Sequence, residues 1–452
     1  MSEAMRQMSA RAERVGVRHG EAERGPTSDE ATDPRGDTED TGSGLLAAAL
    51  SRENLRRAWK RVKANKGSAG VDGRGIDQSA RYLRQAWPDI RDQLLRGTYR
   101  PSPVRRVRIP KPEGGERELG IPTVTDRLIQ QALLQILQGI LDRTFSEHSY
   151  GFRPGRGAHD AVRAARGYIQ AGRTVVVDVD LEKFFDRVNH DILIDRLRKR
   201  IEDPGIIGLI RAYLNSGILS EGIVHERERG TPQGGPLSPL LANVLLDEVD
   251  KVLEERGHCF VRYADDCNVY VRSLKAGARV MALLRKCYGK LGLQLNETKS
   301  AVASVRGRKF LGYSFWRSKG EVKSRVADKP LAKFKHRVRR LTRRVGGRSL
   351  VGVIAELRGY LLGWRAYFGL AQTPALWRRL DAWVRRRLRA LHLKHWKQGP
   401  TICRALQRLG ASPWVAHRVA ANAGSWWRNS NGEIKKVLTI AYFDQLGVPR
   451  FS

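Results

Sequence analysis

The stretch FVRYADDCNV, residues 260–269, constrains the fold more than any other part of the sequence. Apolar residues flank two adjacent carboxylates, Asp265 and Asp266. This pattern predicts a strand, a tight turn that carries both acids, and a returning strand. An ionised carboxylate is strongly disfavoured in a half-buried position unless a partner compensates its charge. We therefore expect a cation close to this turn.

A second acidic strand is predicted in TVVVDVDLEKFFD, residues 174–186. Because side chains alternate along a strand, Asp178 and Asp180 share one face, and the other face carries Val175, Val177 and Val179. Asp178 or Asp186 taken alone has a simpler explanation, since an aspartate at a strand end often caps a helix or orients a turn. If this strand neighbours the hairpin in one sheet, however, the acids converge on one edge, where a divalent cation would stabilise them.

Such a cluster of aspartates predicts a class of chemistry. Two metal ions held by shared aspartates are the standard arrangement for phosphoryl or nucleotidyl transfer, in which one ion activates the attacking hydroxyl and the other stabilises the leaving oxygen. Mg²⁺ is the preferred ion, because hard oxygen ligands and substrate phosphates complete its octahedron. We therefore expect two Mg²⁺ ions as cofactors, for which Mn²⁺ can substitute.

The charge balance indicates the kind of partner. The sequence has 83 lysines and arginines against 47 acidic residues, a formal net charge of +36, which suits a polyanion such as nucleic acid. No run of about 18 apolar residues occurs and no apolar signal segment follows the first arginines, so no membrane association is expected. The predicted location is cytoplasmic, with association to the nucleoid when bound to DNA.

The region beyond residue 320 is strongly basic and has helical periodicity. Such a surface has too little acid to neutralise itself and is expected to bind a phosphate backbone. Its aromatic residues have two explanations. At helical spacing they more often form a packed core, but they can also stack on bases. They are Trp364, Tyr367, Phe368, Trp377 and Trp383.

Several of these segments together resemble one family. Tyr263-Ala264-Asp265-Asp266 resembles the YxDD box of reverse transcriptases, and DLEKFFD (180–186) resembles the first palm motif of that family. GTPQGGPLSPLLANVLLDEVD (230–250) resembles its PQG motif. LRGYLLGWRAYFG (357–369) is similar to the maturase region of bacterial group II intron-encoded proteins. The resemblance covers about residues 45–400.

The resemblance implies roles for individual residues. Asp180, Asp265 and Asp266 match the catalytic metal ligands, with Asp178 as the alternative to Asp180. Phe185 matches the residue that lies under the incoming sugar and excludes a 2′-hydroxyl, although an ordinary core phenylalanine is the alternative.

Four further residues match nucleotide-binding positions. Gln233 lies between prolines and glycines in the PQG motif, where it would contact the nucleotide or the primer end. Lys111 and Arg117 match positions that bind the triphosphate, although a solvated basic face is the alternative for each. Lys299 matches a position near the leaving pyrophosphate.

The fold implied is α+β, a right-hand polymerase with fingers and palm around an antiparallel sheet, followed by an α-helical thumb or maturase domain. The segments expected are a disordered polar tail (1–43), an N-terminal helical extension (44–98), the fingers and palm (99–320), the thumb (321–400) and a basic C-terminal segment (401–452). The chain shows no paired cysteines and histidines near its end, which implies the compact class without an endonuclease.

The function implied is RNA-directed DNA polymerisation by a protein encoded in a group II intron, which also binds the intron RNA to assist splicing and mobility. Its partners would be the intron RNA template, a DNA or RNA primer, dNTPs and target DNA. Two alternatives remain open: an RNA-binding maturase that acts only in splicing, and a reverse transcriptase of the retron or defence type.

Overall fold

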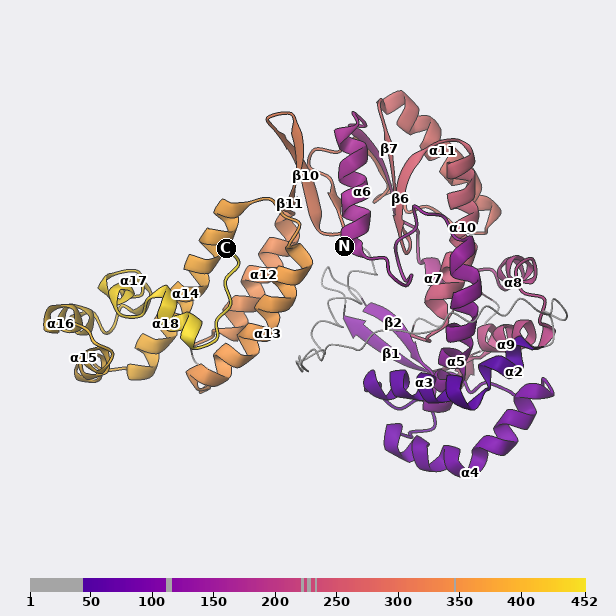
Figure 1. Cartoon of the computed structure of the whole chain (residues 1–452), viewed down its shortest axis with the longest axis horizontal. Coiled ribbons are helices and arrows are strands. Elements are labelled where there is room, and N and C mark those ends of the chain that lie inside the picture. Colours follow the sequence, from indigo (N-terminus) through magenta and orange to yellow (C-terminus); the bar gives the residue numbers. More distant parts are fainter. Residues whose placement is uncertain (1–43, 111–115, 221–222, 226–228, 232–233, 345–346) are drawn as a thin grey trace, which may run out of the picture. The chain divides into compact units, whose positions relative to one another are not determined.

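The computed structural model describes residues 44–110, 116–220, 223–225, 229–231, 234–344 and 347–452. The chain divides into two compact units, whose described parts are residues 44–304 and 305–452. Figure 1 shows that both units combine helices with antiparallel strands. Lys111 and Gln233 lie outside the described residues. Within the described ranges, no helix is long and apolar enough to cross a membrane.

The N-terminal unit begins with helices that pack around α5. Ser51 caps α3, because its side chain accepts a hydrogen bond from the backbone N of Asn54. The Asn54 side chain then donates to the Ala132 carbonyl of α5 at 3.0 Å, which joins the two helices. These first helices are α2 (Leu45–Ala49), α3 (Arg52–Ala64), α4 (Ile76–Leu95) and α5 (Val124–Leu141).

A small sheet, whose first two strands come between α4 and α5, has the strand order β2-β1-β4-β5. Its β1–β2 hairpin is antiparallel, whereas β1 and β4 are parallel. The strands are β1 (Val104–Pro110), β2 (Glu116–Ile121), β4 (Ile218–Ser220) and β5 (Ile223–His225).

The central sheet of this unit has the order β6-β7-β3-β8, and all its pairings are antiparallel. Val175 and Val177 of β3 lie on its first face against α11, where a Cβ on Gly277 would lie 3.5 Å from Val175 and 2.4 Å from Val302 of β8. The opposite face carries Tyr270, whose ring lies 6.0 Å from Tyr168 of α6. Figure 1 shows α6 and α11 on either side of β6 and β7. The strands are β3 (Val175–Val179), β6 (Cys259–Tyr263), β7 (Asp266–Val271) and β8 (Ala301–Ser304).

The remaining α-helices of the N-terminal unit pack around this sheet, with α6 on one face and the others on the side of the main core. They are α6 (Ala158–Gln170), α7 (Phe184–Arg187), α8 (His190–Arg198), α9 (Pro204–Asn215), α10 (Ser238–Glu255) and α11 (Leu274–Lys290). Helix α10 is buried along most of its length, and its buried residues include the polar Asn243, Asp247 and Asp250.

The C-terminal unit joins a small antiparallel sheet to a set of helices with an aromatic core. Phe334 lies 4.3 Å from Trp364 between ring centroids, and Phe451 packs edge-on against both rings. The core explanation for Trp364 is thus confirmed. The elements are β9 (Lys309–Phe310), β10 (Tyr313–Ser318), β11 (Glu321–Val326), α12 (Asp328–Leu341), α13 (Leu350–Phe368), α14 (Pro374–Trp396), α15 (Gly399–Arg408), α16 (Pro413–Ala421), α17 (Trp426–Asn429) and α18 (Ile440–Gln445).

Candidate active site

Strands β6 and β7 form the predicted hairpin, but the turn carries only Asp265, because Asp266 is already paired in β7. Tyr263 pairs with Asp266, so the turn consists of Ala264 and Asp265. Ala264 has a φ of 59°. A positive φ is required at the first position of the two-residue turns whose twist matches that of the flanking strands. For a residue with a Cβ, this left-handed conformation costs roughly 1–2 kcal/mol. The surrounding structure must therefore stabilise the turn.

Strand β3 brings further carboxylates to this turn. Asp178 lies opposite Asn268, and Val179 lies opposite Cys267. If this register continued for one residue past the end of β3, Asp180 would lie opposite Asp266. The acids predicted from two distant segments are thus neighbours on one edge of the central sheet.

The four carboxylates also interact electrostatically. The pKa of Asp266 is raised well above its ordinary value of 3.8, first by burial and then by the negative charges of Asp178, Asp265 and Asp180. A cation placed among these groups would remove both the repulsion and part of the desolvation cost.

The backbone of Asp180 is bound to residues 296–300, the segment that follows α11. The backbone N of Asn296 donates to the Asp180 carbonyl at 2.8 Å, and the Asp180 N donates to Ser300 Oγ at 3.1 Å. Lys299 Nζ lies 3.3 Å from Asp180 Oδ2. Because both side chains are substantially exposed, this ion pair contributes at most about 1 kcal/mol to stability. Lys299 is nevertheless a cation beside Asp180, and its predicted place near the leaving pyrophosphate stays a prediction.

Asp178 has a different environment from Asp180. When the Asn268 amide is oriented to satisfy its neighbours, its nitrogen donates to Asp178 Oδ1 at 3.0 Å. Asp178 is therefore engaged by the adjacent strand, whereas Asp180 lies at the end of β3 with 39% of its side chain exposed. This difference favours Asp180 over Asp178 as the group that meets a ligand.

Phe185 lies in the core at the start of α7. It is 5% exposed, and its ring centroid lies 5.0 Å from that of Phe184. Its carbonyl accepts a hydrogen bond from Thr231 N at 2.7 Å, so Phe185 borders the segment that leads toward the PQG motif. The core packing and the sugar-contacting role are compatible with this position, and the role stays a prediction.

Of the other predicted nucleotide-binding residues, Lys111 and Gln233 lie outside the described residues, and the position of Arg117 is known from its strand. Arg117 lies on β2 opposite Ile109. Gly234, which follows Gln233, has a φ of +138°, and a Cβ there would lie 2.6 Å from the Gly120 carbonyl of β2. Only glycine fits this close approach, which brings the end of the PQG motif to the β1–β2 hairpin.

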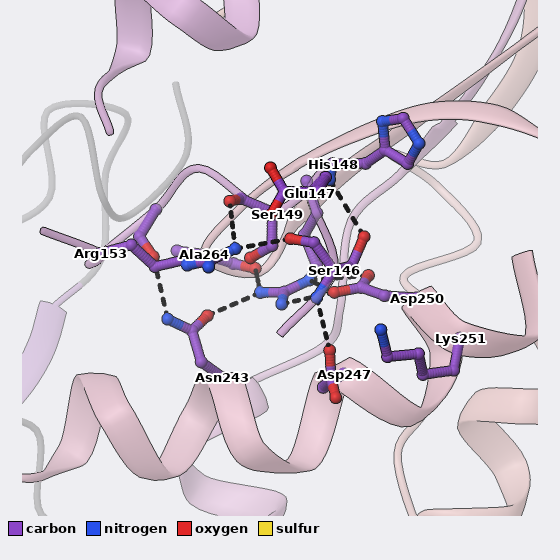
Figure 2. Close-up of polar contacts among 12 residues, drawn as sticks. Ser146, Glu147, His148, Ser149, Arg153, Asn243, Asp247, Asp250, Lys251 and Ala264 are labelled. Carbon is purple, nitrogen blue, oxygen red and sulfur yellow. Dashed lines mark hydrogen bonds and ion pairs between the residues drawn. The ribbon is translucent and has the colours of Figure 1, made fainter. Parts of the chain in front are cut away.

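Sequence reasoning missed a buried network behind the turn. Arg262 of β6 is completely buried and forms an ion pair with Asp250 of α10. Figure 2 shows Asn243 and Asp250 extending from this helix toward the segment 146–153 and Ala264. The available signal was an arginine within an apolar strand together with an aspartate within the apolar pattern of α10.

A metal ion would need oxygen ligands at this edge. Among the residues that the structure describes, no group of three histidine, cysteine, aspartate or glutamate side chains by itself forms a metal site. The donor set nevertheless suits Mg²⁺, because carboxylates that repel one another are its usual protein ligands and it normally keeps several water or phosphate ligands. Asp180, Asp265 and Asp266 are therefore compatible with Mg²⁺ bound jointly with a substrate.

Comparison with known families gives two matches along the chain. Residues 109–315 match the model for reverse transcriptase (RNA-dependent DNA polymerase). Residues 331–410 match the model for the group II intron maturase-specific domain. The two matches fall in the same order as the motifs identified in the sequence.

Individual relatives agree with these matches. Protein YkfC of Escherichia coli is 33% identical over 319 residues, which cover 61% of this chain and 83% of that protein. The group II intron-encoded protein LtrA of Lactococcus lactis is 39% identical over 195 residues, or 43% of this chain and 32% of LtrA. Among solved structures, a chain of the partial Cas6-RT-Cas1–Cas2 complex is 27% identical, with a TM-score of 0.36, over 54% of this chain and 42% of that chain.

The matched domains account for both the acidic hairpin and the basic helical region that follows it. The chain therefore belongs to the reverse transcriptase family, and within it to the group II intron reverse transcriptases and maturases.

Proposed function

We propose that this protein extends a DNA or RNA primer along an RNA template by two-metal nucleotidyl transfer. In this proposal Asp180, Asp265 and Asp266 are the metal ligands. The observation that carries it is the meeting of these carboxylates from two strands, in a chain whose net charge is +36. A protein so rich in cations has no structural need for mutually repelling acids, so their placement supports a role in binding metal and phosphate.

When bound there, a pair of Mg²⁺ ions would activate the primer hydroxyl and neutralise charge on the leaving pyrophosphate. The side chains then have distinct tasks. Asp265 lies on the turn, Asp266 is the first residue of β7, and Asp180 follows β3. Lys299, paired with Asp180, can turn toward a nearby phosphate oxygen because its side chain is 63% exposed.

The remaining predicted residues would position the nucleotide. We assign Lys111 and Arg117 to the triphosphate and Gln233 to the nucleotide or primer end. Phe185 would exclude the 2′-hydroxyl and so select dNTPs. The approach of Gly234 to β2 supports this set, because it joins the PQG motif to the hairpin that carries Arg117.

We further propose that the protein binds its intron RNA to assist splicing. Support comes first from the C-terminal unit, where burial and the charges of Arg344 and Arg339 lower the pKa of Arg387 to about 10. Nearby, the Arg386 guanidinium lies 4.0 Å from the Trp427 ring centroid. Crowded arginines repel one another, so the binding of phosphates lowers the free energy of this surface. A tryptophan beside an arginine offers a surface on which RNA bases stack.

The N-terminal unit offers a second basic surface for RNA. A cleft of about 780 Å³ lies between α3 and α5, and Gln135 and Gln138 contribute to its lining. It is lined by four cations, and none of them forms an ion pair with another described residue; they are Arg57, Lys60, Arg61 and Arg143. Such an open, cationic cleft suits a phosphate backbone better than an apolar small molecule.

Primer extension tests the polymerase proposal directly. The wild type and the variant Asp265→Asn plus Asp266→Asn are compared on an RNA template with dNTPs and Mg²⁺, while intron RNA binding is followed in parallel. We expect extension to be lost and RNA binding to be retained in the variant. Tight RNA binding without extension by the wild type would refute the polymerase proposal and favour a splicing-only maturase.

A second assay separates the two roles in splicing. Intron RNA is incubated with each protein at low Mg²⁺, and spliced product is measured. Splicing assistance by the double variant at the wild-type level is expected, since the carboxylates are not part of the basic surfaces. Failure of the wild type to assist splicing would contradict the maturase role and leave the polymerase role untouched.

A further inference from the structure

Arg262 is a charged residue in a place where charge is costly. It lies on β6 opposite Cys267, on the face of the central sheet away from Asp266, and it is completely buried. Its Nε lies 2.9 Å from Asp250 Oδ1, and its Nη2 lies 2.6 Å from Asp250 Oδ2. Asp250 is also completely buried. The pair therefore links β6 to helix α10 in the interior.

The rest of the guanidinium reaches the catalytic turn itself. Arg262 Nη1 donates to the Ala264 carbonyl at 3.0 Å and to Asn243 Oδ1 at 2.8 Å. Asn243 Nδ2 in turn donates to the Gly151 carbonyl at 2.9 Å. We refer to Arg262, Asp250 and Asn243 as the Arg262 cluster. Its contacts join α10, the turn and the segment 146–153 (Figure 2).

The segment 146–153 is also bound to the backbone of the hairpin. Arg262 N donates to the His148 carbonyl at 2.9 Å, and Tyr150 N donates to the Arg262 carbonyl at 2.8 Å. Gly151 then packs directly against the turn, because a Cβ there would lie 2.2 Å from Ala264 N. The turn is thus in contact with both the Arg262 cluster and the segment 146–153.

A buried ion pair of this kind adds little to the free energy of unfolding. Taking both charges of a buried pair out of water costs several kcal/mol, and well-packed apolar residues often serve as well or better. Burial alone would lower the pKa of Arg262, but the charge of Asp250 outweighs it and the pKa is raised, so the guanidinium stays charged. Apolar residues could not supply the hydrogen-bond donors of the guanidinium, which bind Asp250, Asn243 and Ala264 at the same time.

We infer that Arg262 is a positioning residue for nucleotidyl transfer, and that the Arg262 cluster fixes the left-handed turn so that Asp265 and Asp266 keep their geometry relative to Asp180. The inference rests on the proposed function of these carboxylates. Arg262 lies on the opposite face of the sheet and touches neither substrate nor metal. Its effect passes through the Ala264 carbonyl.

The test compares two arginines bound to the same helix. Arg262→Lys keeps a positive charge near Asp250 but loses the fork that reaches Ala264. The matched control is Arg200→Met, because Arg200 binds the buried Asp247 of α10 at 2.8 Å and does not contact the turn. A third variant, Arg262→Met with Asp250→Leu, replaces the ion pair by apolar side chains.

Four properties are measured for each variant: melting temperature, primer–template affinity, single-turnover dNTP addition with its Mg²⁺ dependence, and hydrogen exchange of the peptide that contains residues 260–269. For Arg262→Lys we expect unchanged primer–template affinity, a rate lower by roughly tenfold to a hundredfold, a higher Mg²⁺ requirement and faster exchange at the turn. The double variant should regain melting temperature without regaining rate. Arg200→Met should lose stability while its Mg²⁺ dependence stays at the wild-type value.

Two results would overturn the positioning role. One is a double variant that recovers both stability and rate, since apolar packing would then be sufficient. The other is a rate loss that follows melting temperature equally in Arg262→Lys and Arg200→Met. An inactive wild type would instead refute the proposed function, and hydrogen exchange at the turn would still report whether Arg262 orders it.

Discussion

Asp266→Asn should make the metal-free protein more stable while abolishing its activity. In the folded protein, burial and the charges of Asp178, Asp265 and Asp180 raise the pKa of Asp266 well above 3.8. Asparagine has nearly the same shape but carries no charge, so it removes the repulsion and most of the desolvation cost. The residue proposed to bind metal is thus one that destabilises the empty site.

The sign and size of the effect follow from linkage. A carboxyl group whose pKa is raised by folding stabilises the protein below its ordinary pKa, and this contribution is lost as the pH rises through the raised value. Each pKa unit corresponds to about 1.4 kcal/mol. For a unit of this size, 1 kcal/mol moves the melting temperature by roughly 2–4 °C. We therefore expect Asp266→Asn to melt at least roughly 2–4 °C above the wild type at pH 8 in EDTA, with a smaller difference at pH 5.

Thermal unfolding followed by circular dichroism measures this difference, with and without Mg²⁺. Added Mg²⁺ should stabilise the wild type more than the variant, which narrows or reverses the gap. The control is Asp89→Asn, because Asp89 is an exposed aspartate of α4. A variant that is less stable than the wild type in EDTA at pH 8, or one that gains as much from Mg²⁺, would refute the electrostatic reasoning.

Three further predictions use other parts of the molecule. Gly151→Ala should lose primer extension and at least about 1 kcal/mol of stability, because its Cβ would meet Ala264 N at 2.2 Å; extension at wild-type rate would show that the turn can move away. Arg386→Gln should weaken intron RNA binding and reduce the slope of log affinity against log salt by about 1, measured by filter binding at several salt concentrations; an unchanged slope would remove Arg386 from the RNA surface. Burial lowers the pKa of His392 from 6.5 to about 4, so its contribution to stability is present above pH 6.5 and is lost as the pH falls toward 4. Unfolding of the C-terminal unit should therefore depend less on pH over this range in His392→Gln, and equal pH dependence in both proteins would contradict that assignment.

Local patterns in the sequence were sufficient for the strands and for the acids that they carry. The alternation around Asp265 and Asp266 predicted the β6–β7 hairpin, and the valines before Asp180 predicted β3. The helical spacing of Trp364 and Phe368 likewise indicated a packed core, in which their ring centroids lie 4.8 Å apart. These predictions succeed because side-chain direction repeats every two residues in a strand and every 3.6 in a helix, so a short stretch reveals its buried face.

The contacts that complete the site were not available from such patterns. The ion pair between Arg262 and Asp250, the bond from Asn243 to Gly151 and the approach of Lys299 to Asp180 all join residues from separate segments. A charged residue shows in the sequence that a partner is needed, but many arginines and aspartates could satisfy that need. The choice among them depends on how strands and helices pack in three dimensions, because desolvation and hydrogen-bond geometry act only once the tertiary structure has brought those groups together.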